Sequence, residues 1–74
     1  MKVEVLQIVK GTGFVGHIYP YYHVSEIVFG EDELGDYFKL ILSGGDEATF
    51  HTNGEKTVWA YMVVEEGRHR YEYN

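Results

Sequence analysis

The side chains of this sequence that could take part in acid–base or metal chemistry are four histidines and a cluster of carboxylates. A protein metal site needs ligands at defined spacings, and without cysteine only histidine and carboxylate are left to supply them. We therefore expect structural or surface histidines and no metal or other cofactor. A weak pH-sensitive site stays an alternative if the fold brings His17 and His23 together, because histidine titrates near neutral pH. The histidines follow no metal-site spacing: His17, His23, His51 and His69.

The remaining polar residues do not indicate catalysis. The carboxylates lie in a segment expected to be an exposed loop, where no desolvation would separate an acid from a base. Ser25 and Ser43 lack the paired glycines of a nucleophile turn, and Gly11-Thr12-Gly13 is too isolated for a phosphate-binding loop. A 74-residue domain also leaves little room for an enclosed substrate pocket. These features predict a binding protein and not an enzyme.

The formal net charge of -6 is concentrated in the middle of the chain. Residues 26–47 contain seven acids and a single base, which account for the whole net charge, because acids and bases cancel elsewhere. Such a field repels phosphate backbones and anionic membranes and suits a basic protein surface. The alternative is that the acidic segment only keeps a small protein soluble. The acids expected to contact a partner lie in a predicted loop at 31–36: Glu31, Asp32, Glu33 and Asp36.

A second unusual feature is a group of tyrosines around the single proline, Pro20. Tyrosine combines a large, stiff contact surface with a polar tip, which explains its enrichment in protein interfaces. We expect these rings, together with an aromatic pair on the last strand, to form a partner-binding patch. The alternative is that they cap the ends of a barrel, with the ring buried and the hydroxyl in water. The residues of the expected patch are Tyr19, Tyr21, Tyr22, Trp59 and Tyr61.

The segments that must position these residues are short β-strands. Apolar and β-branched residues occur in runs broken by glycine, asparagine and aspartate, and no stretch keeps helical spacing for more than a turn or two. A glycine-rich segment at 10–22 predicts a long bent loop, while Ser43-Gly44-Gly45-Asp46 and Asn53-Gly54 predict tight turns. The first strand should contain a bulge or a change of face. The predicted strands cover residues 2–9, 23–29, 37–42, 47–52 and 57–64.

Five short strands in so few residues favour an all-β fold, either a small five-stranded barrel or a strongly curled antiparallel sheet. Closure is economical because it removes exposed strand edges. The length allows one domain, at 1–66, followed by a polar C-terminal tail at 67–74. The chain has no cysteine and therefore no disulfide bond to stabilise this domain. Self-association is an open alternative as a source of stability. No apolar run has the length of a signal peptide or a membrane span, and we expect a cytoplasmic protein.

The order of these elements resembles that of an SH3-like barrel: a first strand, a long bent segment, three strands joined by tight turns, and a short final segment. The stretch from Gly11 to Ile18 is similar to the glycine-rich turn of KOW-type barrels, and the resemblance covers roughly residues 2–65. The chain lacks the Ala-Leu-Tyr-Asp-Tyr-like stretch and the late proline with tyrosine of peptide-binding SH3 domains, so their binding residues are not transferred. Small acidic barrels of this kind also resemble accessory proteins of phages and mobile elements.

These observations predict a regulator or inhibitor that docks on a larger protein through its acidic face and tyrosine-rich loop. Charge would steer the encounter and aromatic side chains would anchor it. Nucleic-acid mimicry is a special case, and it requires carboxylates in a row at phosphate-like spacing. One alternative is a nucleic-acid-binding barrel that uses Trp59, Tyr61 and the basic tail, although the acidic charge disfavours it. Another is a structural subunit of an oligomeric assembly.

Overall fold

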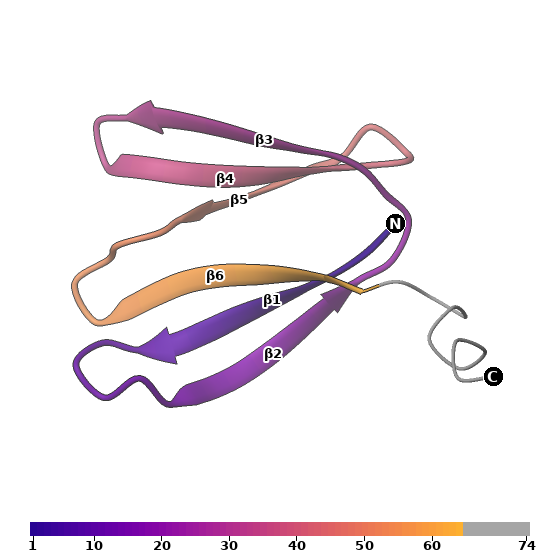
Figure 1. Cartoon of the computed structure of the whole chain (residues 1–74). Helices are drawn as coiled ribbons and strands as arrows, with labels where there is room; N and C mark the ends of the chain where they lie inside the picture. Colours follow the sequence, from indigo (N-terminus) through magenta and orange to yellow (C-terminus); the bar gives the residue numbers. More distant parts are fainter. Residues whose placement is uncertain (65–74) are drawn as a thin grey trace, which may run out of the picture.

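The computed structural model describes residues 1–64, which form an all-β structure of six strands. The strands make two three-stranded antiparallel sheets, with the orders β2-β1-β6 and β3-β4-β5 (Figure 1). The predicted boundary at residue 66 and the tail at 67–74 lie outside the described residues. The strands are β1 (Lys2–Val9), β2 (Val15–Tyr21), β3 (Val24–Asp32), β4 (Gly35–Leu42), β5 (Glu47–His51) and β6 (Thr57–Val64).

Strand β1 is the centre of the first sheet, and its side chains alternate between two environments. Val3 and Val5 are fully buried, because successive residues of a strand face opposite sides and these two face the second sheet. β1 pairs with β6 along its whole length and with β2 from Val3 to Ile8. The register with β2 shifts between Gln7 and Ile8, which pair with His17 and Val15, so the extra residue of this bulge lies on β2. The predicted bulge or change of face in the first strand is therefore wrong, because β1 pairs with β6 without a shift.

The predicted loop at 10–22 is wrong for most of its length, because it contains β2. The glycines are confined to the β1–β2 turn, where Gly11 and Gly13 take φ angles of +87° and +77°, and to Gly16 beside the bulge. Pro20 does not break the strand, since β2 lies at the edge of its sheet and a missing N–H is tolerated there. The chain therefore has six strands where five were predicted.

The first of the two links between the sheets is a sharp bend at Tyr22 and His23, the two residues that separate β2 from β3 (Figure 1). His23 has a φ of +61°, in the left-handed region that few residues other than glycine adopt. Its carbonyl oxygen accepts a hydrogen bond from the Ser43 N–H at 2.9 Å, which ties the bend to the β4–β5 turn. The predicted second strand thus begins one residue later, at Val24, and continues to Asp32.

The predicted closed barrel is also wrong, because β5 and β6 meet only beside the turn that joins them. There the Trp59 N–H donates to the Thr52 carbonyl at 3.0 Å, and Asn53 and Val58 form an isolated bridge. β5 does not form a continuous ladder along β6, because the two strands belong to different sheets. Among residues 1–64, the result is two separate sheets packed face to face rather than one sheet closed on itself.

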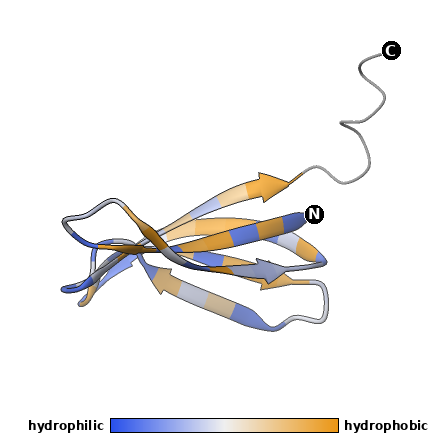
Figure 2. Cartoon of the chain, turned by 90° about the horizontal axis from the view of Figure 1, so that it is seen from below, coloured by the Kyte–Doolittle hydropathy of each residue, from blue (hydrophilic) through white to orange (hydrophobic). Residues whose placement is uncertain are grey.

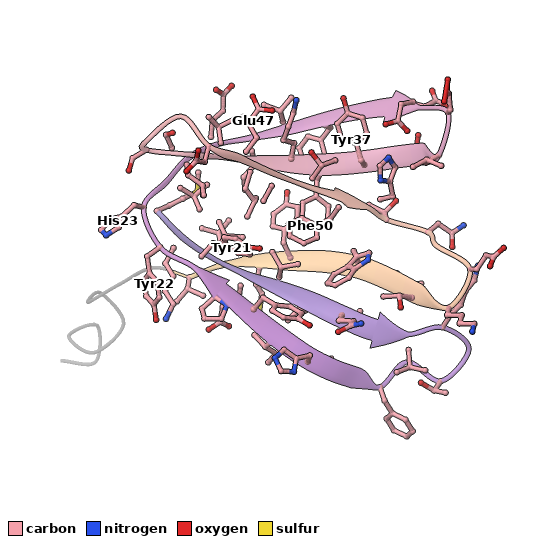
Figure 3. All side chains as sticks on the ribbon, turned by 180° about the vertical axis from the view of Figure 1, so that it is seen from behind. Tyr21, Tyr22, His23, Tyr37, Glu47 and Phe50 are labelled. Atoms are coloured by element: carbon pink, nitrogen blue, oxygen red, sulfur yellow. The ribbon has the colours of Figure 1, made fainter. Side chains whose placement is uncertain are left out.

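The core lies between the two sheets and contains a chain of aromatic rings. Phe38 on β4 is 1% exposed, and its ring centroid lies 5.3 Å from that of Phe50 and 5.0 Å from that of Tyr61. Phe50 in turn contacts Trp59 and Tyr21, at 5.2 and 5.9 Å (Figure 3). These aromatic contacts join side chains of both sheets. The fully buried residues are Val3, Val5, Val24, Phe38 and Leu40.

The predicted tight turn at Ser43-Gly44-Gly45-Asp46 is confirmed. The Gly45 N–H donates to the Leu42 carbonyl and the Leu42 N–H to the Asp46 carbonyl, both at 2.8 Å. Gly45 has a φ of +95°, a conformation in which a Cβ would be strained. The turn sets the register of β4 on β5, which pairs Phe38 with Phe50 and Leu40 with Ala48.

Candidate functional site

The acidic residues expected to contact a partner lie on a hairpin and not on an open loop. β3 continues to Asp32 and β4 begins at Gly35, so only Glu33 and Leu34 stand outside the strands. Gly35 has a φ of +112°, while neither turn residue has a positive φ, an arrangement typical of a type I turn followed by a glycine bulge. The predicted loop at 31–36 is therefore wrong as a loop. We call residues 29–36 the acidic hairpin.

The Asp32 carboxylate fixes the conformation of this hairpin. Its Oδ1 accepts a hydrogen bond from the Leu34 N–H at 2.9 Å, and the His51 Nε2 lies 2.9 and 3.1 Å from the two carboxylate oxygens. The bond from Leu34, followed by the contact with His51, lowers the pKa of the Asp32 carboxyl from its ordinary value of 3.8. The ion pair with His51 exists when the imidazole is protonated. Asp32 is thus held at the surface by contacts within the protein, one of them with His51 on β5.

This pKa shift predicts an acid-sensitive contribution to stability. A carboxyl whose pKa is lower in the folded than in the unfolded chain stabilises the fold above its unfolded pKa, and that contribution is lost as the pH falls through the folded pKa. We expect the urea midpoint to fall below about pH 3.8 in the wild type and to lose this component in Asp32→Asn.

The control for this prediction is His51→Gln, which keeps the stronger bond from the Leu34 N–H and should keep part of the pH dependence. The carboxyl shift of Asp32 in an NMR titration gives its pKa directly. A pKa for Asp32 at or above 3.8 would contradict the prediction.

Two apolar side chains of the acidic hairpin are largely exposed, and the sequence analysis did not select them. Leu34, at the tip, is 76% exposed, and Phe29, on β3, is 66% exposed. The Phe29 ring centroid lies 6.2 Å from that of Tyr61, so Phe29 extends the aromatic core outward to the hairpin. One signal for Leu34 was present in the sequence, since it is a lone apolar residue between acids at a turn.

The tyrosines of the expected patch are distributed among different environments. Tyr21 packs edge-on against Phe50 at 5.9 Å, and Tyr61 lies 5.0 Å from Phe38, so both belong to the partly buried shell of the core. Tyr22 is 55% exposed at the β2–β3 bend, where the Lys2 ammonium lies 4.9 Å from its ring centroid (Figure 3). For Tyr21 and Tyr61, this placement favours the alternative of capping aromatic residues.

Tyr19 and Trp59 are the two patch residues that the structure brings together at an accessible position. Their ring centroids are 6.0 Å apart, and the Tyr19 hydroxyl donates to the Gln7 Oε1 at 3.2 Å. Trp59 is half-buried, and Tyr19 is 37% exposed. Tyr22 lies far from the acidic hairpin, because the nine-residue β3 places the hairpin about 26 Å from the bend. The predicted site residues therefore lie in more than one region.

The histidines do not converge into a single site. The His17 ring packs against that of Tyr19, with centroids 4.4 Å apart and the planes tilted by 41°. His23 instead occupies the bend, beyond about 13 Å of extended β2 backbone. His51 instead pairs with Asp32. Within residues 1–64, no three histidine, aspartate or glutamate side chains form a group that could hold a metal ion.

Together these features define a small two-sheet all-β domain with an acidic, partly apolar hairpin at one end. Comparisons with protein-family models, with curated proteins and with solved structures found no match. In the described part of the chain, no helix has the length and apolarity needed to cross a membrane.

Proposed function

We propose that this protein is a non-enzymatic protein-binding module, a regulator or inhibitor, that docks its acidic hairpin on a basic surface of a larger partner. The observation that carries the proposal is the exposure of Phe29 and Leu34, at 66% and 76%, among four carboxylates. Binding hot spots combine buried apolar anchors with a polar rim, and the hairpin offers both groups on one rigid element. The partner would supply an apolar pocket surrounded by lysine and arginine.

The distribution of charge between the two sheets supports this choice of surface. The β3-β4-β5 sheet and its turns carry all seven acids of residues 26–47 with the single base Lys39. In the rest of the described chain, three lysines stand against two glutamates. The molecule is therefore polarised, and its acidic half would steer a basic partner toward the hairpin.

Nucleic-acid mimicry receives no support from the hairpin geometry. Glu31 and Asp32 are successive residues of a strand and face opposite sides, and Asp32 is bound to His51. These carboxylates do not form the single row that a phosphate backbone would require. We propose docking on an ordinary basic protein surface instead.

The finer assignment of the fold, to the SH3-like barrels, also remains a proposal. Three strands joined by tight turns, β3 to β5, follow the β1–β2 hairpin, and β6 returns to pair with β1. This order supports an SH3-like arrangement in which the barrel is open between β5 and β6 and between β2 and β3. A cytoplasmic location stays a prediction from the sequence.

The test is affinity capture of partners from the native host lysate with the full chain and with Phe29→Ala/Leu34→Ala, analysed by mass spectrometry. We expect one protein partner in stoichiometric amount with the wild type, and a loss of binding of at least about tenfold for the double variant, the size typical of hot-spot residues. Raised salt should weaken capture, because charged groups steer the encounter.

The matched control is Phe14→Ala, which removes an equally exposed phenylalanine, 72% exposed, from the β1–β2 turn. It should leave capture unchanged. Recovery of nucleic acid alone would contradict the proposal and favour the nucleic-acid-binding alternative. A protein partner retained equally by the double variant would place the binding surface elsewhere and overturn the assignment of the hairpin.

A further inference from the structure

The outward side of the β2-β1-β6 sheet is apolar, although the core lies on the other side of the same sheet. Since Val3 and Val5 of β1 face the core, the alternate residues Leu6 and Ile8 face away from it. Cross-strand partners of an antiparallel pair lie on the same side of a sheet. Leu6 pairs with Ile18 on β2 and with Ala60 on β6.

The cross-strand partners of Ile8 and Glu4 extend this surface along β2 and β6. Ile8 pairs with Val15 and Val58, and Glu4 pairs with Pro20 and Met62. We call this surface, formed by the outward residues of β1, β2 and β6, the outer face. Figure 2, which shows the molecule from below, shows hydrophobic residues recurring along β1 and at the end of β6.

Nothing in the described part of the chain covers the outer face. Val15 and Ile18 are each 47% exposed and Met62 is 45% exposed, and none of them belongs to the cluster packed between the sheets. The second sheet lies on the opposite side of β1 (Figure 1). Leu6 and Ile8 are half-buried only through their neighbours on the same sheet.

The outer face is as large as the largest apolar patches of monomeric proteins, which are often functional. Three strands about 4.8 Å apart and about 26 Å long give a flat footprint of about 370 Å². Monomeric proteins rarely expose contiguous apolar patches larger than a few hundred Å². Two such faces in contact would bury about 740 Å² in total, less than a stable interface of standard size, so the association would be weak and concentration-dependent.

The charges on the outer face indicate which partner would cover it. It carries one base and one acid, Lys2 and Glu4, whose Nζ and Oε2 lie 3.9 Å apart. A neutral apolar face with one group of each sign is complementary to itself, as a two-fold symmetric interface requires. The acidic charge lies on the other sheet, so two copies joined here would keep their acidic sheets apart.

We propose that the protein forms a homodimer in which the outer faces of two β2-β1-β6 sheets pack together. The second copy covers Leu6, Ile8, Ile18 and Met62, and it sets the Lys2 and Glu4 pairs of the two copies against each other. The acidic hairpins stay uncovered on the outside of the dimer. The proposal concerns a different surface from the acidic hairpin and does not depend on its function.

The experiment is analytical ultracentrifugation of the full chain from about 1 to 500 μM, a range that brackets the affinity expected for a small interface. The wild type should shift from monomer to dimer within this range. Ile18→Lys and Met62→Lys should each weaken dimerisation at least about tenfold, because each places a charge in the apolar interface. High salt should not dissociate the dimer.

The matched control is Thr49→Lys, which adds the same charge at an exposed position of β5 on the outward side of the other sheet. It should dimerise like the wild type, and circular dichroism checks that all variants are folded. Independently of any variant, dilution should shift the amide NMR signals of β1, β2 and β6 and leave those of β4 unchanged. A monomer at every concentration, or a dimer unaffected by both lysine substitutions, would overturn the proposal.

Discussion

Replacing Phe38 with alanine is expected to lower the free energy of unfolding by about 3–5 kcal/mol, the range for removing a buried phenylalanine. Phe38 is 1% exposed and lies between Phe50 and Tyr61, so its loss leaves a cavity where rings of both sheets meet. A chain of 74 residues has a total stability of roughly 4–11 kcal/mol. Phe38→Ala should therefore remove a large share of the total stability, as measured by circular dichroism and urea denaturation.

Two further variants keep this prediction measurable if Phe38→Ala does not fold. Phe38→Leu retains most of the apolar volume and should cost only about 1–2 kcal/mol. Phe29→Ala removes the same ring from a position that is 66% exposed and should cost less than about 1 kcal/mol. Equal losses for Phe38→Ala and Phe29→Ala would show that the aromatic cluster is not the centre of the core.

Replacing Gly30 with alanine should cost about 1–3 kcal/mol, because the side chain of Tyr37 occupies the place of the missing Cβ. Gly30 pairs with Tyr37 across β3 and β4, and an added Cβ would lie 2.6 Å from the Tyr37 Cζ and overlap its hydroxyl. The ring would have to leave the glycine and its edge-on contact with His51, whose centroid is 5.5 Å away. Urea denaturation of the variant measures the loss.

The matched control is Gly44→Ala in the β4–β5 turn, where an added Cβ meets no atom within 4 Å and no positive φ opposes it. It should change stability by less than about 0.5 kcal/mol. When Tyr37 is also replaced by alanine, Gly30→Ala should hardly change the free energy of unfolding, because the ring that meets the added Cβ is then absent. A loss that persists without the ring would place its cause in the backbone of β3.

The two proposed surfaces lie on different sheets, and this separation has a functional consequence. A dimer formed through the outer face would leave two acidic hairpins exposed, one from each copy. Two hairpins engaging a partner with repeated basic sites would bind it more tightly than one, through an increased effective concentration. The lysine substitutions on the outer face and Phe29→Ala/Leu34→Ala on the hairpin separate the two effects.

Several elements could be predicted from the sequence because their signals are local. Alternation and β-branched residues identified the strands at 2–9 and 57–64 with the bounds that the structure has. The two glycines in Ser43-Gly44-Gly45-Asp46 identified that turn, and in the structure Gly45 has the positive φ that glycine tolerates. The acidic charge of the hairpin is likewise a matter of composition, so the sequence predicts the character of that surface directly. Its role in binding stays a prediction.

The predictions that failed depend on pairing between distant residues. β2 looked like a loop because glycine and Pro20 suggest breaks, and only its position at a sheet edge beside β1 makes it a strand. The acidic segment at 31–36 looked like a loop because its residues are polar, yet the bond between Asp32 and Leu34 closes it into a hairpin. Closure of a barrel required β5 and β6 to pair along their length, and they do not.

The sequence alone determined that this chain is acidic, and the spacing of its apolar residues and turn signals indicated short strands. Only the tertiary structure decided which of the apolar residues are buried: Val3 and Val5 of β1 are covered, whereas Leu6 and Ile8 are left on the outer face. Both pairs suit a strand equally well, because alternation defines two faces of a sheet but does not say what packs on either. Burial depends on the second sheet, and that arrangement exists only in the folded chain.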